Sequence, residues 1–142
     1  MFSRSAGYAV QALTYLAEQP PGKLAGAREI ATATRIPMPF LWKILRNLSR
    51  KKLVRSFKGV RGGYELARSA ERIRVEQILS AMQNNGGYMP CIFGFGPCDE
   101  HHPCALHDSW TEIRNDLEAL LHRTTLADLA ARGKPHRRRK SS

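Results

Sequence analysis

The residues of this chain best suited to hold a metal lie together in one glycine- and proline-rich segment, PCIFGFGPCDEHHPCALHDSW, which covers residues 90–110. The segment contains every cysteine of the chain and three of its five histidines, namely Cys91, Cys98, Cys104, His101, His102 and His107. Thiolates and imidazoles are the ligands that zinc and iron centres use in proteins. An odd number of cysteines in a reducing compartment does not suit a disulfide framework, and it favours metal or redox chemistry.

The spacing of these ligands is Cys-x6-Cys-x5-Cys-x2-His, without the paired Cys-x2–4-Cys knuckles of zinc ribbons and fingers. Wide spacing in a flexible loop favours an iron–sulfur cluster, which is larger than one ion and is held by thiolates spread around it. Cys104 and His107 lie at the expected start of a long helix, where both can point the same way and where the helix N-terminus favours negative charge. The three cysteines are the predicted ligands, and the adjacent His101 and His102 are alternatives to His107 as the fourth.

The net charge of +11 is distributed unevenly along the 142 residues. Residues 1–70 carry 13 Lys or Arg and 3 Asp or Glu, residues 71–133 carry 5 and 9, and residues 134–142 carry 5 and none. Generic solvation of surface helices would scatter the charge more evenly. A basic first half followed by a mildly acidic region therefore predicts that the first half binds a polyanion such as nucleic acid.

The first half shows the pattern of three helices followed by a β-hairpin. One helix is expected to end near EQPPGK, a second covers residues 27–34, and Pro39 suits the first position of a third. The buried faces expected for the first and third helices are Ala6, Val10, Leu13 and Ala17, and Leu41, Ile44, Leu45 and Leu48. Two strand-like runs, Leu53–Phe57 and Tyr64–Ala67, flank a turn rich in glycine and basic residues. This order predicts a winged helix-turn-helix.

A recognition helix needs a buried face toward its own domain and an opposite face that can enter the major groove. The third helix has both, and a basic wing tip can enter a narrow minor groove. The predicted DNA-binding residues of the helix and the wing are Pro39, Phe40, Trp42, Lys43, Arg46, Arg50, Arg55, Lys58 and Arg61. Phe40 and Trp42 flank the buried face, so partial core packing is an alternative role for both.

The second half predicts a further helix, the cysteine segment and then one long helix; the further helix is marked by Val75, Ile78, Leu79 and Met82. Apolar residues of the long helix recur at alternating steps of four and three, which is a heptad-like seam: Leu106, Trp110, Ile113, Leu117 and Leu120. Two copies paired through this seam would read the two half-sites of a palindrome. The alternative is that the seam packs against its own domain.

These patterns predict a mainly α fold with a small β-hairpin, in which a winged helix-turn-helix domain is joined to a long C-terminal dimerisation helix. We expect the winged domain over residues 1–84 and a cluster-binding loop over residues 85–104. The dimerisation helix and a short helix near residues 126–131 are expected within residues 105–131. Residues 132–142 form a basic, low-complexity tail that is expected to be disordered.

Over roughly residues 1–130, the chain resembles the IscR/NsrR/RirA-type winged-helix repressors of bacteria. The resemblance rests on GYAVQALTYLA, PFLWKILRNLSRKKLV, GVRGGYELA, IRVEQILSAM and the cysteine segment. It implies a homodimeric transcription factor whose binding to double-stranded, palindromic operator DNA responds to an iron–sulfur cluster of the 2Fe–2S or 4Fe–4S type. The cluster ligands that the resemblance implies are Cys91, Cys98 and Cys104.

The fourth ligand distinguishes the branches of this family. In the IscR branch a histidine three residues after the third cysteine is the fourth ligand, and His107 matches that position. In the nitric-oxide-sensing branch an acidic residue from the partner's first helix serves instead, and Tyr8 holds that place here. The first cysteine gap of six residues is one longer than in the IscR pattern, so the resemblance does not specify the cluster type.

The sequence also argues against other classes of protein. It has no apolar run of about 18 residues and no cleavage-site pattern after its first helix, so we expect a cytoplasmic protein with no membrane partner. It has no Cys-x-x-Cys, phosphate loop or Ser/His/Asp set, so we expect neither an enzyme, such as a thiol oxidoreductase, nor a small-molecule substrate. The expected function is a repressor controlled by iron, redox state or nitric oxide. The alternative is a zinc-stabilised nucleic-acid-binding protein without a sensory role.

Overall fold

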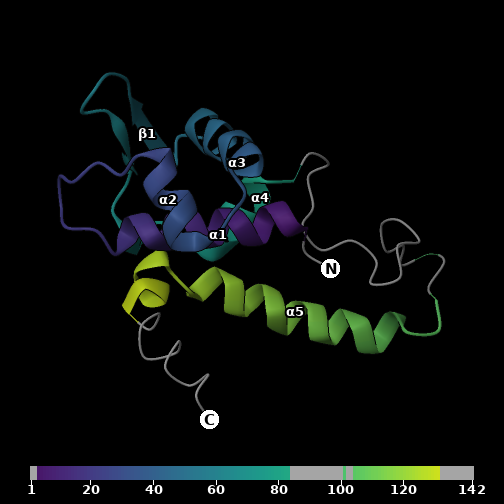
Figure 1. Ribbon diagram of the computed structural model, residues 1–142. Helices are drawn as coiled ribbons and strands as arrows, with labels where there is room; N and C mark the ends of the chain where they lie inside the picture. Colours follow the sequence, from purple (N-terminus) through teal and green to yellow (C-terminus); the bar gives the residue numbers. More distant parts are fainter. Residues whose placement is uncertain (1–2, 84–100, 102–103, 132–142) are drawn as a thin grey trace, which may run out of the picture.

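The computed structural model describes residues 3–83, 101 and 104–131, which form a mainly helical structure with one two-stranded antiparallel sheet (Figure 1). In chain order, the elements are α1 (Arg4–Ala17), α2 (Ala27–Thr34), α3 (Met38–Arg50), β1 (Val54–Phe57), β2 (Gly63–Leu66), the 3-10 helix η1 (Ala70–Arg72), α4 (Val75–Ala81) and α5 (His107–Arg123). Residues 126–131 are also helical. The expected fold class is confirmed. Among the helices described, none is long and apolar enough to cross a membrane.

The core lies around α1, which packs against α2, α3, α4 and β2. α3 buries the four residues that its periodicity predicted, and Leu41, Leu45 and Leu48 are fully inaccessible to solvent. Leu126, from the helical residues 126–131, is fully buried in the same core. A segment that follows α5 in the sequence therefore completes the core of the winged domain.

α1 is buried over a broader face than its sequence predicted. The buried residues are Ala6, Ala9, Ala12, Leu13 and Leu16. Val10 and Ala17, which the periodicity placed on the buried face, are only partly buried. The small alanine side chains let neighbouring elements approach α1 from several sides, and a search for one stripe of large apolar residues does not detect this.

A short turn separates α2 from α3. Arg35 ends α2 in the left-handed conformation, with a φ of 61°. Pro37 is the N-cap of α3, and its carbonyl accepts two backbone hydrogen bonds, each 3.0 Å long. α3 therefore begins at Met38, one residue before the predicted start at Pro39, which occupies the second helical position instead. Proline is tolerated there because the first-turn N–H groups have no partner within the helix.

The wing is the antiparallel hairpin of β1 and β2, and its strands agree with the predicted ones to within one residue. Beyond the strands, Ala67 donates a backbone hydrogen bond of 3.0 Å to the carbonyl of Leu53. β2 is also joined to the segment before α2, because Ala25 and Tyr64 exchange two backbone hydrogen bonds of 3.0 and 2.8 Å. Leu53 in turn donates a backbone hydrogen bond of 2.9 Å to the carbonyl of Leu48 in α3, so the wing is fixed both to α3 and to the segment before α2.

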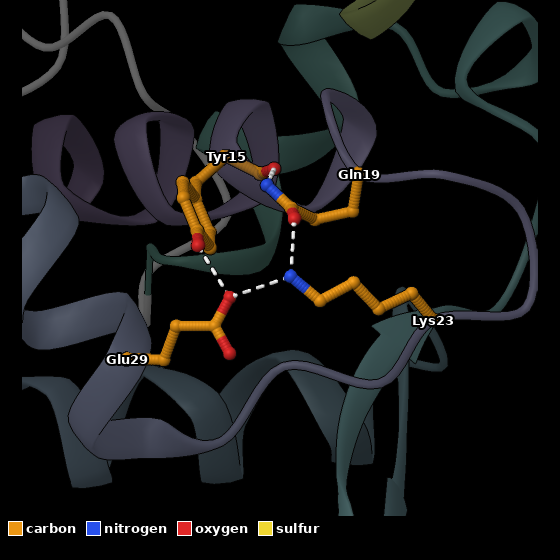
Figure 2. A network of polar contacts seen from close by, with 4 residues as sticks. All are labelled: Tyr15, Gln19, Lys23 and Glu29. Carbon is orange, nitrogen blue, oxygen red and sulfur yellow. Dashed lines mark hydrogen bonds and ion pairs between the residues drawn. The ribbon is translucent and has the colours of Figure 1, made fainter.

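A polar network holds the end of α1 against α2 (Figure 2). The Tyr15 hydroxyl donates a hydrogen bond to the Glu29 carboxylate, and the Lys23 ammonium lies 3.2 Å from the same carboxylate. Lys23 also donates a hydrogen bond of 3.0 Å to the side chain of Gln19. The hydrogen bond to Glu29 is the main cause that raises the pKa of Tyr15 to about 12, and the same bond lowers the pKa of Glu29. The loop between the two helices is thereby tied to both of them.

α5 lies on the side of α1 that faces away from α3 and the wing (Figure 1). Its C-terminal end is joined to the winged domain by the Arg74 guanidinium, which donates a hydrogen bond of 2.8 Å to the carbonyl of His122. The His122 imidazole lies 2.5 Å from the Glu76 carboxylate. The chain then returns to the core, where the N–H of Leu126 donates a hydrogen bond of 2.8 Å to the carbonyl of Ile73.

Candidate nucleic-acid interface

The outward face of α3 carries basic and aromatic side chains. Each predicted residue of this face is exposed, namely Pro39, Phe40, Trp42, Lys43, Arg46 and Arg50. Their exposure follows from the burial of the opposite face in the core, and this is the arrangement that a recognition helix needs. The rings of Phe40 and Tyr8 are tilted with centroids 6.1 Å apart, so Phe40 also packs partly on α1.

The wing exposes all three of its predicted basic residues, but it uses them differently. Arg55 is held by its own hairpin, because its guanidinium donates a hydrogen bond of 3.0 Å to the carbonyl of Ala67 and lies 3.9 Å from the Glu65 carboxylate. Lys58 and Arg61 lie at the exposed turn between the strands. These two cations are therefore better placed than Arg55 to bind a polyanion.

Acidic side chains do not cancel the charge of this surface. Of the three acidic residues in the first 70, Glu18 is the C-cap residue of α1, and Glu29 is occupied by Lys23 and Tyr15, on the network that joins α1 to α2. Glu65 faces Arg55 within the hairpin. The outward face of α3 and the tip of the wing therefore keep a positive field, which attracts a polyanion from a distance.

A cleft of about 400 Å³ opens between α3, the wing and the start of α2. Its lining residues include Trp42 of α3, Ala27 at the start of α2, and Phe57, Lys58 and Tyr64 of the wing. The sequence indicated Trp42 and Lys58, but it gave no sign of Phe57 and Tyr64, because aromatic residues in short strands are ordinary sheet formers. Tyr64 also pairs with Ala25, far away in the sequence, which brings the segment before α2 to the edge of this cleft.

The structure describes part of the predicted metal site. Cys91, Cys98 and His102 lie outside the described residues. Cys104 is a free, exposed thiol just before α5, and its carbonyl accepts a backbone hydrogen bond of 3.0 Å from His107, the first residue of α5. A free, accessible thiol and an imidazole in one turn fit the donor set of a thiolate-held cluster. Within the described residues, no three His, Cys, Asp or Glu side chains form a group that could hold a metal.

The apolar residues of α5 divide into two sets that differ in exposure. Leu106, which is the N-cap, Ile113 and Leu120 are spaced by seven residues and are 42%, 57% and 44% exposed. We call these three residues the outer stripe. Trp110 is only 5% exposed and Leu117 is partly buried, so these two do not share the outer stripe. The seam expected from the sequence is therefore split between a face turned inward and a face left open.

Comparison with known proteins places these features in one family. The sequence matches the Rrf2 family, described as iron-dependent transcriptional regulators, over residues 2–132. A protein of Aquifex aeolicus named as a candidate HTH-type transcriptional regulator is 34% identical over 131 residues, which cover 91% of this chain and 90% of that protein. The HTH-type transcriptional regulator IscR of Cereibacter sphaeroides is 30% identical over 126 residues, which cover 86% of this chain and 81% of that protein. These are names of regulators and not of enzymes.

Solved structures share the same fold. CymR, the global cysteine regulator of B. subtilis, superposes with a TM-score of 0.78 and 24% identity over 92% of this chain and 96% of that one. IscR of T. potens superposes with a TM-score of 0.74 and 25% identity over 96% of this chain and 90% of that one. The chain therefore belongs to the Rrf2 family of transcriptional regulators.

Proposed function

We propose that this protein is a homodimeric repressor whose binding to a palindromic operator in the cytoplasm is controlled by an iron–sulfur cluster that responds to iron, redox state or nitric oxide. The proposed ligands are Cys91, Cys98, Cys104 and His107. The observation that carries the proposal is the position of Cys104 and His107. A free, exposed thiol and an imidazole share the turn that begins α5, the helix whose outer stripe lies open.

The DNA-binding part of the proposal is supported by α3 and the wing. Lys43 and Arg46 project from the exposed face of α3, and Lys58 and Arg61 from the tip of the wing. We assign α3 to the major groove and the wing tip to the adjacent minor groove. Paired copies of the chain would then read two half-sites, whose separation is set by the dimer.

The outer stripe supports the homodimer. A helix with three large apolar residues open to solvent at a spacing of seven gains stability when a second copy covers them. We assign residues 1–84 to the winged domain, residues 85–104 to the cluster-binding loop and residues 105–131 to dimerisation, with residues 132–142 as a disordered basic tail. In this arrangement the predicted ligands lie between the two DNA-binding domains and the interface that spaces them.

A bound cluster would supply a centre that exchanges electrons and reacts with nitric oxide. Cys104 and His107 would hold the first turn of α5 in one position when they act as ligands. Because half-site spacing tolerates little error, fixing the start of α5 alters specific affinity without touching a base contact. Non-specific attraction through phosphate charge should persist without the cluster.

The first experiment is spectroscopy of the full chain after anaerobic purification, with iron and sulfide counts. The expected result is a brown protein in which Cys91→Ala, Cys98→Ala or Cys104→Ala each abolishes the visible absorption. His107→Ala should weaken or reshape the spectrum, because solvent or a neighbouring histidine can replace one imidazole. Ser109→Ala, in the same helical turn, is the control. A colourless protein with one zinc per chain would instead support the zinc-stabilised alternative.

The second experiment compares the apo and cluster-loaded forms on DNA. An operator is first selected by the wild-type protein from a pool of random duplexes, and a scrambled duplex of the same length is the reference. Loss of the cluster should change affinity for the operator much more than affinity for the scrambled duplex. Equal operator affinity in the two forms would overturn the sensing mechanism and leave the metal a structural role.

A further inference from the structure

Two polar atoms near the start of α5 are buried without a hydrogen-bond partner. They are Nε1 of Trp110 and Oγ1 of Thr111, and in the part of the chain that the structure describes no other buried side-chain nitrogen or oxygen is left in this state. Trp110 is only 5% exposed, so bulk water does not satisfy its indole N–H. A buried polar group without a partner costs free energy, and each one in a folded protein therefore requires an explanation.

Both atoms belong to side chains on the same side of α5 as a predicted ligand. Trp110 and Thr111 follow His107, the first residue of the helix, by three and four residues. Residues at these spacings are neighbours on the surface of a helix. Helical side chains also lean toward the N-terminus, so Trp110 and Thr111 extend back over the turn that carries His107 and Cys104. The unpaired groups are therefore concentrated where two of the proposed ligands lie.

The helix itself offers Thr111 an acceptor that it does not use. A threonine within a helix can donate its hydroxyl to the carbonyl four residues earlier. Thr14, Thr34 and Thr124 do so in this protein, over 2.7, 2.6 and 2.7 Å. Thr111 makes no such bond to the carbonyl of His107. Its hydroxyl is therefore available to an acceptor outside the helix backbone.

The chemistry of the proposed ligand set identifies this acceptor. A hydroxyl can donate a hydrogen bond, and an indole N–H can only donate, so the missing partner is an acceptor for both. The sulfur atoms of a thiolate-held cluster carry negative charge, and hydrogen bonds to them are among the features that set its reduction potential. Cys104, a free thiol at this turn, would supply one of those sulfur atoms.

We propose that the Trp110 indole and the Thr111 hydroxyl donate hydrogen bonds to sulfur atoms of the cluster, and this inference rests on the proposed function. The acceptor is anionic sulfur, either a cluster sulfide or a ligating thiolate. Reduction adds negative charge to the cluster, so these bonds stabilise the reduced form more than the oxidised form. Trp110 and Thr111 therefore raise the reduction potential, and they set the redox range in which the repressor responds.

The test uses the full chain, purified anaerobically with its cluster. Trp110→Phe removes the N–H and keeps an aromatic ring, and Thr111→Val removes the hydroxyl and keeps the shape of the side chain. Both variants should hold as much iron and sulfide as wild type. In a redox titration with dithionite as the electron donor, each should lower the equilibrium constant for one-electron reduction about tenfold, or about 59 mV. Thr111→Ser should restore the potential, and Ser109→Ala, which removes an exposed hydroxyl from the same turn, should leave it unchanged.

Resonance Raman spectra in H₂O and D₂O report the hydrogen bonds directly. In wild type, exchange of the N–H and O–H protons for deuterium should shift the Fe–S stretching bands. Each of the two substitutions should reduce that shift, and Ser109→Ala should not. A shift in the bands of bridging sulfide would assign the acceptor to the cluster itself, and a shift in the terminal Fe–S bands would assign it to a thiolate.

Two outcomes would overturn the inference and leave the proposed function standing. One is a wild-type potential and deuterium shift in folded Trp110→Phe and Thr111→Val variants that keep their iron. The other is a Trp110→Phe variant that becomes monomeric with an unchanged potential, which would assign the indole N–H to an acceptor on the second copy. Circular dichroism shows whether Trp110→Phe folds, and Thr111→Val decides if it does not. A wild-type protein that holds zinc or no metal would contradict the proposed function itself, and this inference with it.

Discussion

The winged domain and α5 bury their apolar residues very differently. Around α1, the inward-facing residues of α3 and Leu126 are buried, and Leu45 and Leu126 are fully so. α5 has 17 residues and buries one of them, Trp110, while Ile113 is 57% exposed. One region is thus complete within a single chain, and the other presents an apolar surface that the chain does not cover.

This difference separates folding from assembly. A helix of this length is marginal in water unless an apolar face is packed against a partner. The winged domain draws its stability from its own core, whereas α5 depends on its C-terminal attachment near Arg74 and on whatever covers the outer stripe. A signal that acts on the start of α5 could therefore alter the proposed dimer while the DNA-binding surface stays folded.

The strongest test of the self-sufficient core is Leu45→Ala. Leu45 is fully buried, so we expect the free energy of unfolding to fall by about 2–5 kcal/mol through lost burial and the cavity left behind. Lys43→Ala, on the exposed face of the same helix, should change it by less than about 0.5 kcal/mol. Urea denaturation at two protein concentrations measures both. If both changes lowered the free energy of unfolding by the same small amount, the winged domain would not draw its stability from its own core.

The corresponding test of the open helix is Ile113→Lys. We expect this change to give monomers in sedimentation and to weaken operator binding by about 100-fold, the lower range of the gain from joining two binding sites. Asn115→Lys adds the same charge on nearly the opposite side of the helix and should keep the dimer. The winged domain should stay folded in both variants. A wild-type protein that is monomeric at micromolar concentration would contradict the role of the outer stripe.

The sequence predicted most of the winged domain because its signals are local. The stripe of α3 from Leu41 to Leu48 recurs with the helical period, and a glycine-rich basic turn lies between two short strand runs. These patterns specify an element without knowledge of its neighbours. The strands were therefore correct to within one residue, and the start of α3 differed by one because Pro37 already serves as its cap.

The remaining features depend on contacts between distant residues. Periodicity along α5 could not show that Trp110 turns inward while Ile113 stays open, because both fit one seam. Leu121, which the seam omitted, packs against the small cluster of Val75 and Leu79. The bridge between Ala25 and Tyr64 likewise has no local signature. For the metal site, the type and spacing of the cysteines indicated a thiolate-held centre. That Cys91, Cys98, Cys104 and His107 come together around one cluster stays a prediction.

The attachment of α5 to the winged domain offers a smaller test. Arg74→Ala removes the hydrogen bond of 2.8 Å to the carbonyl of His122, so the free energy of unfolding should fall by about 1 kcal/mol. Amide exchange at Leu126, which follows this junction, should become faster. Arg72→Ala, an exposed cation two residues earlier, is the control. Unchanged exchange at Leu126 in the Arg74 variant would show that this hydrogen bond does not hold the junction together.

The smallest expected effect is a pH dependence confined to the winged domain, and Tyr15→Phe tests it. The hydrogen bond from Tyr15 lowers the pKa of Glu29 below its ordinary value of 4.5, so the stabilisation it gives is present above that pH and is lost as the pH falls through the lowered pKa. At the alkaline end, the pKa of Tyr15 is raised to about 12, so its stabilisation is complete below pH 10 and is lost as the pH approaches 12. Because the Glu29 side chain is 37% exposed, solvent screening keeps the effect small.

The melting temperature of Tyr15→Phe should therefore lie below that of wild type at pH 7, and this difference in melting temperature should narrow toward pH 3. Lys23→Met removes the neighbouring ion pair but keeps this bond. The pH-dependent difference in melting temperature between Lys23→Met and Tyr15→Phe should therefore remain mostly as large as that between wild type and Tyr15→Phe. A gap of equal size at both pH values would show that Tyr15 acts through packing and not through Glu29.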